Sequence, residues 1–146
     1  MEPFPHHYTV MGSATADSGS HVALRATNVP EIVTAPPAEF GGPGDQWSPE
    51  SLLVGAVADC FILSFRAIAR ASKLDWTDLH CTASGTLDRV DGVTRFTAIE
   101  VNANLTVPEG TDRQKAEKLL HKAEKSCLIT NSLIAESTLT ANVVGA

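Results

Sequence analysis

Alternating apolar and polar residues predict two β-hairpins and a closing strand. Residues 8–16 and 21–27 are rich in Thr, Val and Ala, and Asp17-Ser18-Gly19-Ser20 between them is typical of a turn. Residues 79–87 and 94–107 alternate on either side of Asp91-Gly92, a pair that favours a tight hairpin turn. The alternation of residues 137–144 predicts a last strand.

A long apolar run between the hairpins predicts a central helix. Ser48 can cap its start, Pro49 fits the first helical position, and Glu50 lies near the positive end of the helix dipole. We expect this helix to continue to about Ala71. Apolar residues occupy nearly every face of it, which is typical of a helix that is buried on all sides.

A second helix is expected near the end of the chain. Pro108-Glu109-Gly110 ends the preceding strand, and Thr111 or Asp112 can cap the helix that follows. Its apolar face contains Ala116, Leu119, Leu120, Ala123 and Cys127. The Pro- and Gly-rich residues 30–48 predict an ordered loop. This order of strands and helices indicates an α+β protein, with one domain over residues 1–146.

Composition and charge narrow the class of ligand. The 146 residues are 43% hydrophobic, and 17 acidic against 11 basic side chains give a net charge of -6. No basic stripe is recognisable, which disfavours nucleic acid and anionic lipid as partners. The N-terminus lacks a secretory pattern, and residues 52–65 are too short and carry a charge, which disfavours a membrane span. We expect a cytoplasmic protein with a small ligand.

Three cysteines are the candidate chemical groups. A single cysteine most often packs as a small hydrophobic residue. Cys60 and Cys127, however, both lie on inner helix faces, where they can meet as the nucleophilic and resolving thiols that reversible peroxide chemistry requires. A buried thiol needs a nearby cation or several hydrogen-bond donors before its thiolate is stable. Cys81 lies in a strand pattern and is expected to be packing. The spacing of Cys and His residues disfavours a metal site.

Two segments resemble the OsmC/Ohr family. Residues 48–61, SPESLLVGAVADCF, are similar to its first signature, in which a Pro-Glu pair precedes an apolar run that ends in Cys-Phe. Residues 123–133, AEKSCLITNSL, resemble the second signature, a cysteine followed by Asn-Ser. The order of elements also agrees over nearly the whole chain. The resemblance implies an antiparallel sheet packed on a central buried helix, in an intertwined homodimer.

The resemblance also implies an activity and roles for residues. It implies peroxiredoxin-like reduction of organic hydroperoxides with no metal or prosthetic group and with an external dithiol as reductant. Cys60 would be the peroxidatic residue and Cys127 the resolving one. Glu50 matches a glutamate that holds an arginine in the family. The usual arginine positions contain none, so Arg25 is the nearest candidate, and a solvated strand charge is an equally good interpretation of it.

The surroundings of Cys60 predict an apolar substrate pocket. We expect Trp47, Val57, Phe61 and Ser64 to line it, although Trp47 serves equally well as loop packing. The alternative function is a protein that binds an apolar small molecule and has weak or no peroxidase activity. Ten helical residues at ~1.5 Å each place Glu50 roughly 15 Å from Cys60 along one helix. If Glu50 acts on a reactive cysteine, we therefore expect it to act on Cys60 of a second subunit, in a shared site, or on its own Cys60 through a long relay.

Overall fold

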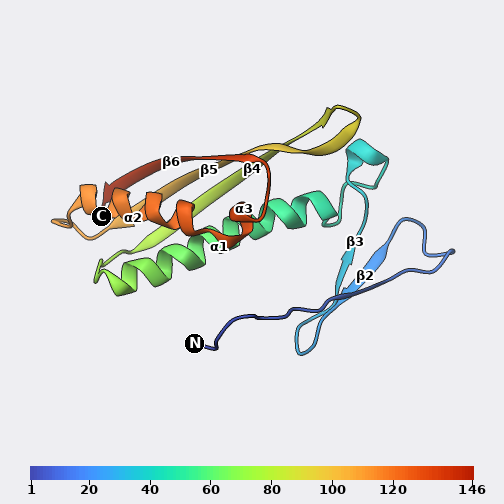
Figure 1. Ribbon diagram of the computed structural model, residues 1–146, viewed down its shortest axis with the longest axis horizontal. Coiled ribbons are helices and arrows are strands. Elements are labelled where there is room, and N and C mark those ends of the chain that lie inside the picture. The colour runs from blue at the N-terminus through green and yellow to red at the C-terminus, as the bar shows by residue number, and fades with distance from the viewer. The chain divides into compact units, whose positions relative to one another are not determined.

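The computed structural model describes residues 1–146, which form two compact units, residues 1–52 and 53–146. Figure 1 labels the elements of both units. The elements in chain order are β1 (Met11–Ser13), β2 (Val22–Arg25), β3 (Ile32–Thr34), the 3-10 helix η1 (Ala38–Phe40), α1 (Pro49–Ala71), β4 (Asp78–Val90), β5 (Val93–Val107), α2 (Arg113–Ser126), α3 (Leu128–Asn131) and β6 (Glu136–Gly145).

The first unit contains a three-stranded antiparallel sheet in the order β1-β2-β3. The predicted turn is confirmed, and the backbone N–H of Ser18 donates to the Thr15 carbonyl at 3.1 Å. The expected loop over residues 30–48 is wrong in one part, because Ile32–Thr34 form β3 and Leu24 pairs with Ile32. Two β-branched residues and a threonine favour extended backbone there despite the prolines that follow.

The predicted start and end of the central helix are confirmed, since α1 spans Pro49–Ala71. The backbone N–H of Ser51 donates to Ser48 Oγ at 3.1 Å, which satisfies one of the donors that every helix start leaves free. By length and composition alone α1 could also cross a membrane, a property that it shares with core helices of soluble proteins. Its most apolar 18-residue window is 22% buried.

In the single chain α1 is buried along one face only. Its fully buried residues repeat every four positions and so form one stripe: Val57, Phe61, Phe65 and Ala69. Other apolar side chains of the helix remain accessible, and Leu63 is 54% exposed. The sequence pattern shows which faces of the helix are apolar. It does not show whether the same chain or a second subunit buries each face.

The second unit contains the sheet β4-β5-β6. β4 and β5 form the predicted antiparallel hairpin, and Asp91 (φ 52°) and Gly92 (φ 79°) adopt the left-handed backbone that its tight turn requires. The expected all-antiparallel sheet is wrong at its edge, because β6 runs parallel to β5. Residues 108–135 cross from the end of β5 back to its start, and such a crossover is what a parallel pair needs.

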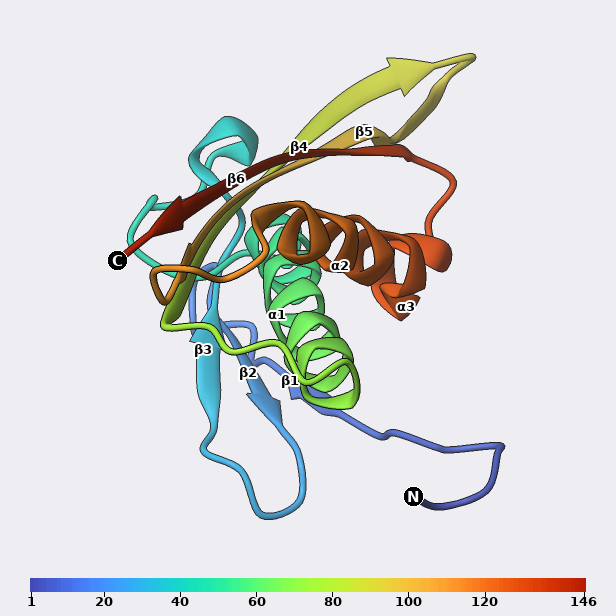
Figure 2. The same cartoon turned by 90° about the vertical axis from the view of Figure 1, so that its left-hand side faces the viewer.

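The helices α1 and α2 pack on one face of this sheet (Figure 2). Alternate residues of β5 are buried beneath them: Ile99, Val101, Ala103, Leu105 and Val107. The N-terminal cap of α2 is Asp112, whose carboxylate accepts a hydrogen bond from the Lys115 backbone at 3.1 Å. The predicted inner face of α2 is confirmed at Ala116, Leu119, Leu120 and Ala123.

Candidate thiol site

The structure brings Cys60 and Cys127 together within the second unit. Cys60 lies in the middle of α1 and is partly exposed. Cys127 is 1% exposed and lies at the junction of α2 and α3, rather than on the inner face of α2 as the pattern predicted. The Cys127 side chain lies near enough to the Cys60 sulfur to lower the pKa of Cys60. The two cysteines are free thiols.

Hydrogen-bond donors around Cys60 favour its thiolate. Burial raises the pKa of Cys60, but the backbone N–H of Ile129, the Cys127 thiol, the Ser64 hydroxyl and the backbone N–H of Leu128 all lower it. Together these donors outweigh the cost of burial, and the pKa of Cys60 falls below its usual value of 9.0. Cys60 thus meets the requirement for a stabilised thiolate through several donors and without a cation.

The donors exist because a new helix turn starts at Cys127. Its backbone is extended (φ −65°, ψ 107°), which ends α2, and its side chain does not cap α3. The first N–H groups of a helix have no partner within it, so those of Leu128 and Ile129 remain free to face Cys60. Thr130 Oγ1 donates to the Cys127 carbonyl at 3.1 Å, and Asn131 Nδ2 donates to the Lys125 carbonyl at 3.1 Å, which hold the turn in place.

The remaining predicted pocket residues lie in different places. Ser64 Oγ is 3.9 Å from Cys60 Sγ. Val57 and Phe61 are 0% and 1% exposed and belong to the hydrophobic core of the second unit, so their side chains offer no surface to a ligand there. Trp47 belongs to the first unit, is 55% exposed, and accepts a backbone hydrogen bond from Ala35 at 2.9 Å.

The predicted charged pair is not formed in the chain. The guanidinium Nε of Arg25 lies 2.6 Å from Glu31 Oε1, and both side chains are about half exposed. Glu50 forms no ion pair, and its Oε1 atom is buried without a hydrogen-bond partner. Arg25 is therefore held by a different acid, while Glu50 retains an unused acceptor.

Cys81 is a partly buried side chain of β4 that packs against the hydrophobic core. Burial, followed by the charge of Cys127, raises the pKa of Cys81 to about 11. At neutral pH Cys81 is a protonated thiol and a poor nucleophile.

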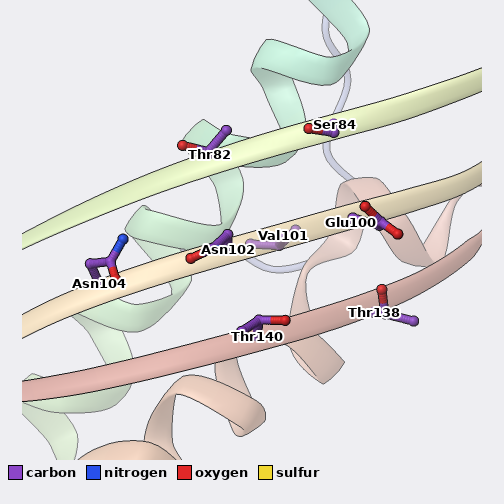
Figure 3. A pocket seen from close by; sticks show the side chains of 8 residues that line it. All are labelled: Thr82, Ser84, Glu100, Val101, Asn102, Asn104, Thr138 and Thr140. Atoms are coloured by element: carbon purple, nitrogen blue, oxygen red, sulfur yellow. The ribbon is translucent and has the colours of Figure 1, made fainter.

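A separate hollow of about 440 Å³ lies on the face of the sheet away from the helices. Figure 3 shows its lining of hydroxyl, amide and carboxylate side chains, which come from β4, β5 and β6. The predicted site residues are not among them.

The protein is a small α+β domain in which Cys60 of α1 lies close to Cys127, at the junction of α2 and α3 in the crossover. A sequence profile described as "OsmC-like protein" matches residues 42–142, and the chain belongs to this family. The family includes proteins named peroxiredoxin and organic hydroperoxide resistance protein.

Three relatives and one solved structure illustrate the similarity. The chain is 25% identical to YmaD of Bacillus subtilis (strain 168) over 88% of this chain and 87% of that protein. It is 30% identical to peroxiredoxin OsmC of Escherichia coli (strain K12) over 63% of this chain and 64% of that protein. It is 28% identical to the organic hydroperoxide resistance protein of Xanthomonas axonopodis pv. citri (strain 306) over 86% of each. The solved structure of an OsmC-like protein of Vibrio cholerae shares the fold, with a TM-score of 0.84 and 17% identity. The match covers 96% of this chain and 100% of that chain.

Proposed function

We propose that the protein is a thiol-dependent peroxidase that reduces organic hydroperoxides. The observation that carries the proposal is the set of donors around Cys60, one of which is a second thiol. The Cys60 thiolate attacks the distal oxygen of the hydroperoxide, the O–O bond breaks, and the alkoxide leaves as an alcohol after taking a proton. Cys60 is then a sulfenic acid.

Cys127 completes the cycle within the same unit. Its thiol attacks the Cys60 sulfenic sulfur, an S–S bond forms, and the hydroxyl leaves as water. An external dithiol then reduces the disulfide and becomes oxidised in turn. The cycle needs neither a metal ion nor a prosthetic group. Partial exposure of Cys60 and burial of Cys127 suit these roles, because the substrate must reach the first sulfur only.

The functional unit we propose is a homodimer with shared sites. Much of the apolar surface of α1 is uncovered in the single chain, and a second subunit can cover it. Glu50 supports this arrangement, since its buried Oε1 has no partner in its own chain. Because Glu50 and Cys60 are far apart along one helix, we infer that Glu50 acts on the cysteine of the partner subunit.

The alternative is a protein of the same fold that binds an apolar small molecule with little peroxidase activity. The observation in its favour is the engagement of Arg25 by Glu31, which leaves no arginine beside Glu50. The donors around Cys60 favour the peroxidase, because they lower the pKa of its thiol, and a cysteine that only packs has no need of a stabilised thiolate.

Peroxide consumption by the reduced protein separates these functions. We expect the wild type to consume cumene hydroperoxide, Cys60→Ser to be inactive, and Cys81→Ser, the matched control, to retain activity. Peptide mapping after one equivalent of hydroperoxide should find a Cys60–Cys127 disulfide and free Cys81. Wild-type activity no higher than that of Cys60→Ser would favour the binding function.

Substrate preference gives a second test of the site. We expect faster turnover with cumene hydroperoxide than with hydrogen peroxide, because Leu128, whose N–H faces Cys60, exposes 66% of its apolar side chain. Leu128→Ser should reduce this preference, while Leu87→Ser, an exposed leucine on β4, should leave it unchanged. Equal efficiency of the wild type towards the two peroxides would contradict an apolar site.

A further inference from the structure

The exposed face of α2 concentrates positive charge. Lys118, His121, Lys122 and Lys125 line a hollow of about 430 Å³ on it. Positions three and four residues apart share one helix face, so these side chains project together. α2 contains five of the eleven Lys and Arg residues of a chain whose net charge is -6. The expectation of no basic stripe is therefore wrong for α2, where Lys118, Lys122 and Lys125 recur at helical spacing.

The three lysines of this face are free of partners. The side-chain ammonium groups of Lys118, Lys122 and Lys125 form no hydrogen bond or ion pair, whereas that of Lys115 on the same helix donates to the Ser72 carbonyl at 2.9 Å. The acids of the same helix are Glu117, whose Oε1 lies 4.0 Å from His121 Nε2, and Glu124, which directly precedes Lys125. We call Lys118, Lys122 and Lys125 the lysine face. Its charge is available to an outside anion.

The lysine face lies on the segment that also supplies the resolving thiol. Lys125 precedes Cys127 by two residues, and its carbonyl accepts the hydrogen bond from Asn131 that holds α3 in place. Figure 1 shows α2 leading directly into α3, whose first turn faces Cys60. The lysine face and the resolving thiol therefore belong to one continuous segment of the chain.

We propose that the lysine face is the docking surface for an acidic protein that carries the reducing dithiol. This inference rests on the proposed function, because only a Cys60–Cys127 disulfide requires a reductant. A neutral small thiol gains nothing from the lysines, and an acidic protein would otherwise be repelled by the net charge of -6. Opposite charges at the contact raise the rate of encounter.

The electron transfer follows from the exposure of the two sulfurs. A thiolate of the docked carrier attacks Cys60 Sγ, which is partly exposed, and the buried Cys127 leaves as a thiolate and takes a proton. The second thiol of the carrier, as its thiolate, then attacks the carrier sulfur of the mixed disulfide. Cys60 leaves as a thiolate, the carrier departs as a disulfide, and two electrons have passed to the protein.

Two synthetic peptides test the proposal. Each contains a Cys-Gly-Pro-Cys dithiol, followed in one by six glutamates and in the other by six glutamines. Stopped-flow measurement follows reduction of the peroxide-oxidised wild type, with dithiothreitol as an uncharged reference. We expect the glutamate peptide to react about 3- to 10-fold faster than the glutamine peptide at low salt, and the difference to vanish at high salt.

Matched variants locate the effect. Lys118→Glu/Lys122→Glu/Lys125→Glu should abolish the advantage of the glutamate peptide, while the dithiothreitol rate stays unchanged. Lys73→Glu/Arg89→Glu/Arg95→Glu changes the net charge equally at exposed positions outside α2 and should retain the advantage. A triple Lys→Gln variant of the lysine face repeats the test if the reversal impairs folding. Equal rates for the two peptides with the wild type, or equal losses in both charge-reversal variants, would overturn the proposal.

Direct binding separates this proposal from the proposed function. Fluorescence anisotropy of labelled peptides, with their cysteines replaced by serine, needs no peroxidase activity. We expect the glutamate peptide to bind the wild type and not the lysine-face variant. If the protein binds the glutamate peptide but consumes no peroxide, the proposed peroxidase function is wrong, whereas the lysine face still binds anions. A single-stranded hexanucleotide that binds this face more tightly than the glutamate peptide would overturn an acidic protein as its partner.

Discussion

The reactivity of Cys60 depends on donors that belong to the protein backbone as much as to side chains. The N–H groups of Leu128 and Ile129, the Cys127 thiol and the Ser64 hydroxyl offset the effect of burial on its pKa. In Cys81 burial has no such compensation, and its pKa rises to about 11. Two partly buried thiols of one chain therefore differ in reactivity because of what faces each sulfur.

Alkylation kinetics test this difference. Only the thiolate reacts, so the rate rises with pH and levels off above the pKa. Because the pKa of Cys60 is lowered, we expect its rate to level off below pH 9.0, whereas that of Cys81 should still rise towards pH 11. Mass spectrometry of iodoacetamide-treated protein at each pH gives both profiles. A profile for Cys60 that levels off above that of Cys81 would contradict the donor arrangement.

Ser64→Ala should weaken the Cys60 thiolate. Loss of one hydrogen bond, worth about 0.5–1.5 kcal/mol, raises the pKa of Cys60 and slows its alkylation at neutral pH by roughly 2- to 10-fold. Ser20→Ala, in an exposed turn, is the matched control and should leave the profile unchanged. Identical profiles for Ser64→Ala and the control would show that Ser64 does not donate to the thiolate.

Sequence reasoning found the two cysteines of the site but not their donors. Cys60 and Cys127 were recognisable from residue type, inward helix position and family-like segments. The N–H groups of Leu128 and Ile129 were not, because every residue except proline carries one, and only the break at Cys127 leaves these two free. To predict these two donors, one would need to know that the backbone of Cys127 is extended.

At the scale of elements, the residues that start and stop helices and turns were the most predictive. Ser48 and Pro49 fixed the start of α1, and Asp91-Gly92 fixed the β4–β5 turn. The direction of β6 could not be predicted, since alternation of apolar and polar residues is the same in parallel and antiparallel strands. The crossover through α2 and α3, which the sequence does contain, decides that direction.

Gly85 illustrates a close contact that no sequence pattern reveals. A Cβ atom at this position of β4 would lie 2.8 Å from Phe96 Cε1 and 2.9 Å from Val54 Cγ2. We expect Gly85→Ala to lower the free energy of unfolding by about 1–3 kcal/mol through overpacking. Urea denaturation at fixed protein concentration measures it. Ser84→Ala, at the neighbouring exposed position, should change stability little, and an equal effect of the two variants would contradict the contact.

At the scale of the whole molecule, the proposed shared site makes a quantitative prediction for mixed dimers. After equal mixing and exchange of Cys60→Ser with Glu50→Gln, half of the dimers are hybrids, and each has one intact site if Glu50 acts across the interface. Activity should recover to about a quarter of the wild-type value. Confirmed exchange without recovery would indicate that each chain builds its own site.

The matched control uses the double variant Cys60→Ser/Glu50→Gln in place of Glu50→Gln. Its mixture with Cys60→Ser contains no reactive cysteine and should remain inactive. Subunit exchange is verified by native mass spectrometry, so that a lack of recovery reflects the position of Glu50 and not a failure to mix.

The crossover between β5 and β6 also governs when the thiol site can exist. During synthesis Cys60 and the β4–β5 hairpin emerge before Cys127 and α3, because they precede them in the chain. Until then Cys60 lacks the N–H groups and the thiol that favour its ionised form. A nascent chain that ends before α3 therefore holds a comparatively inert cysteine, and its reactivity arises late in synthesis.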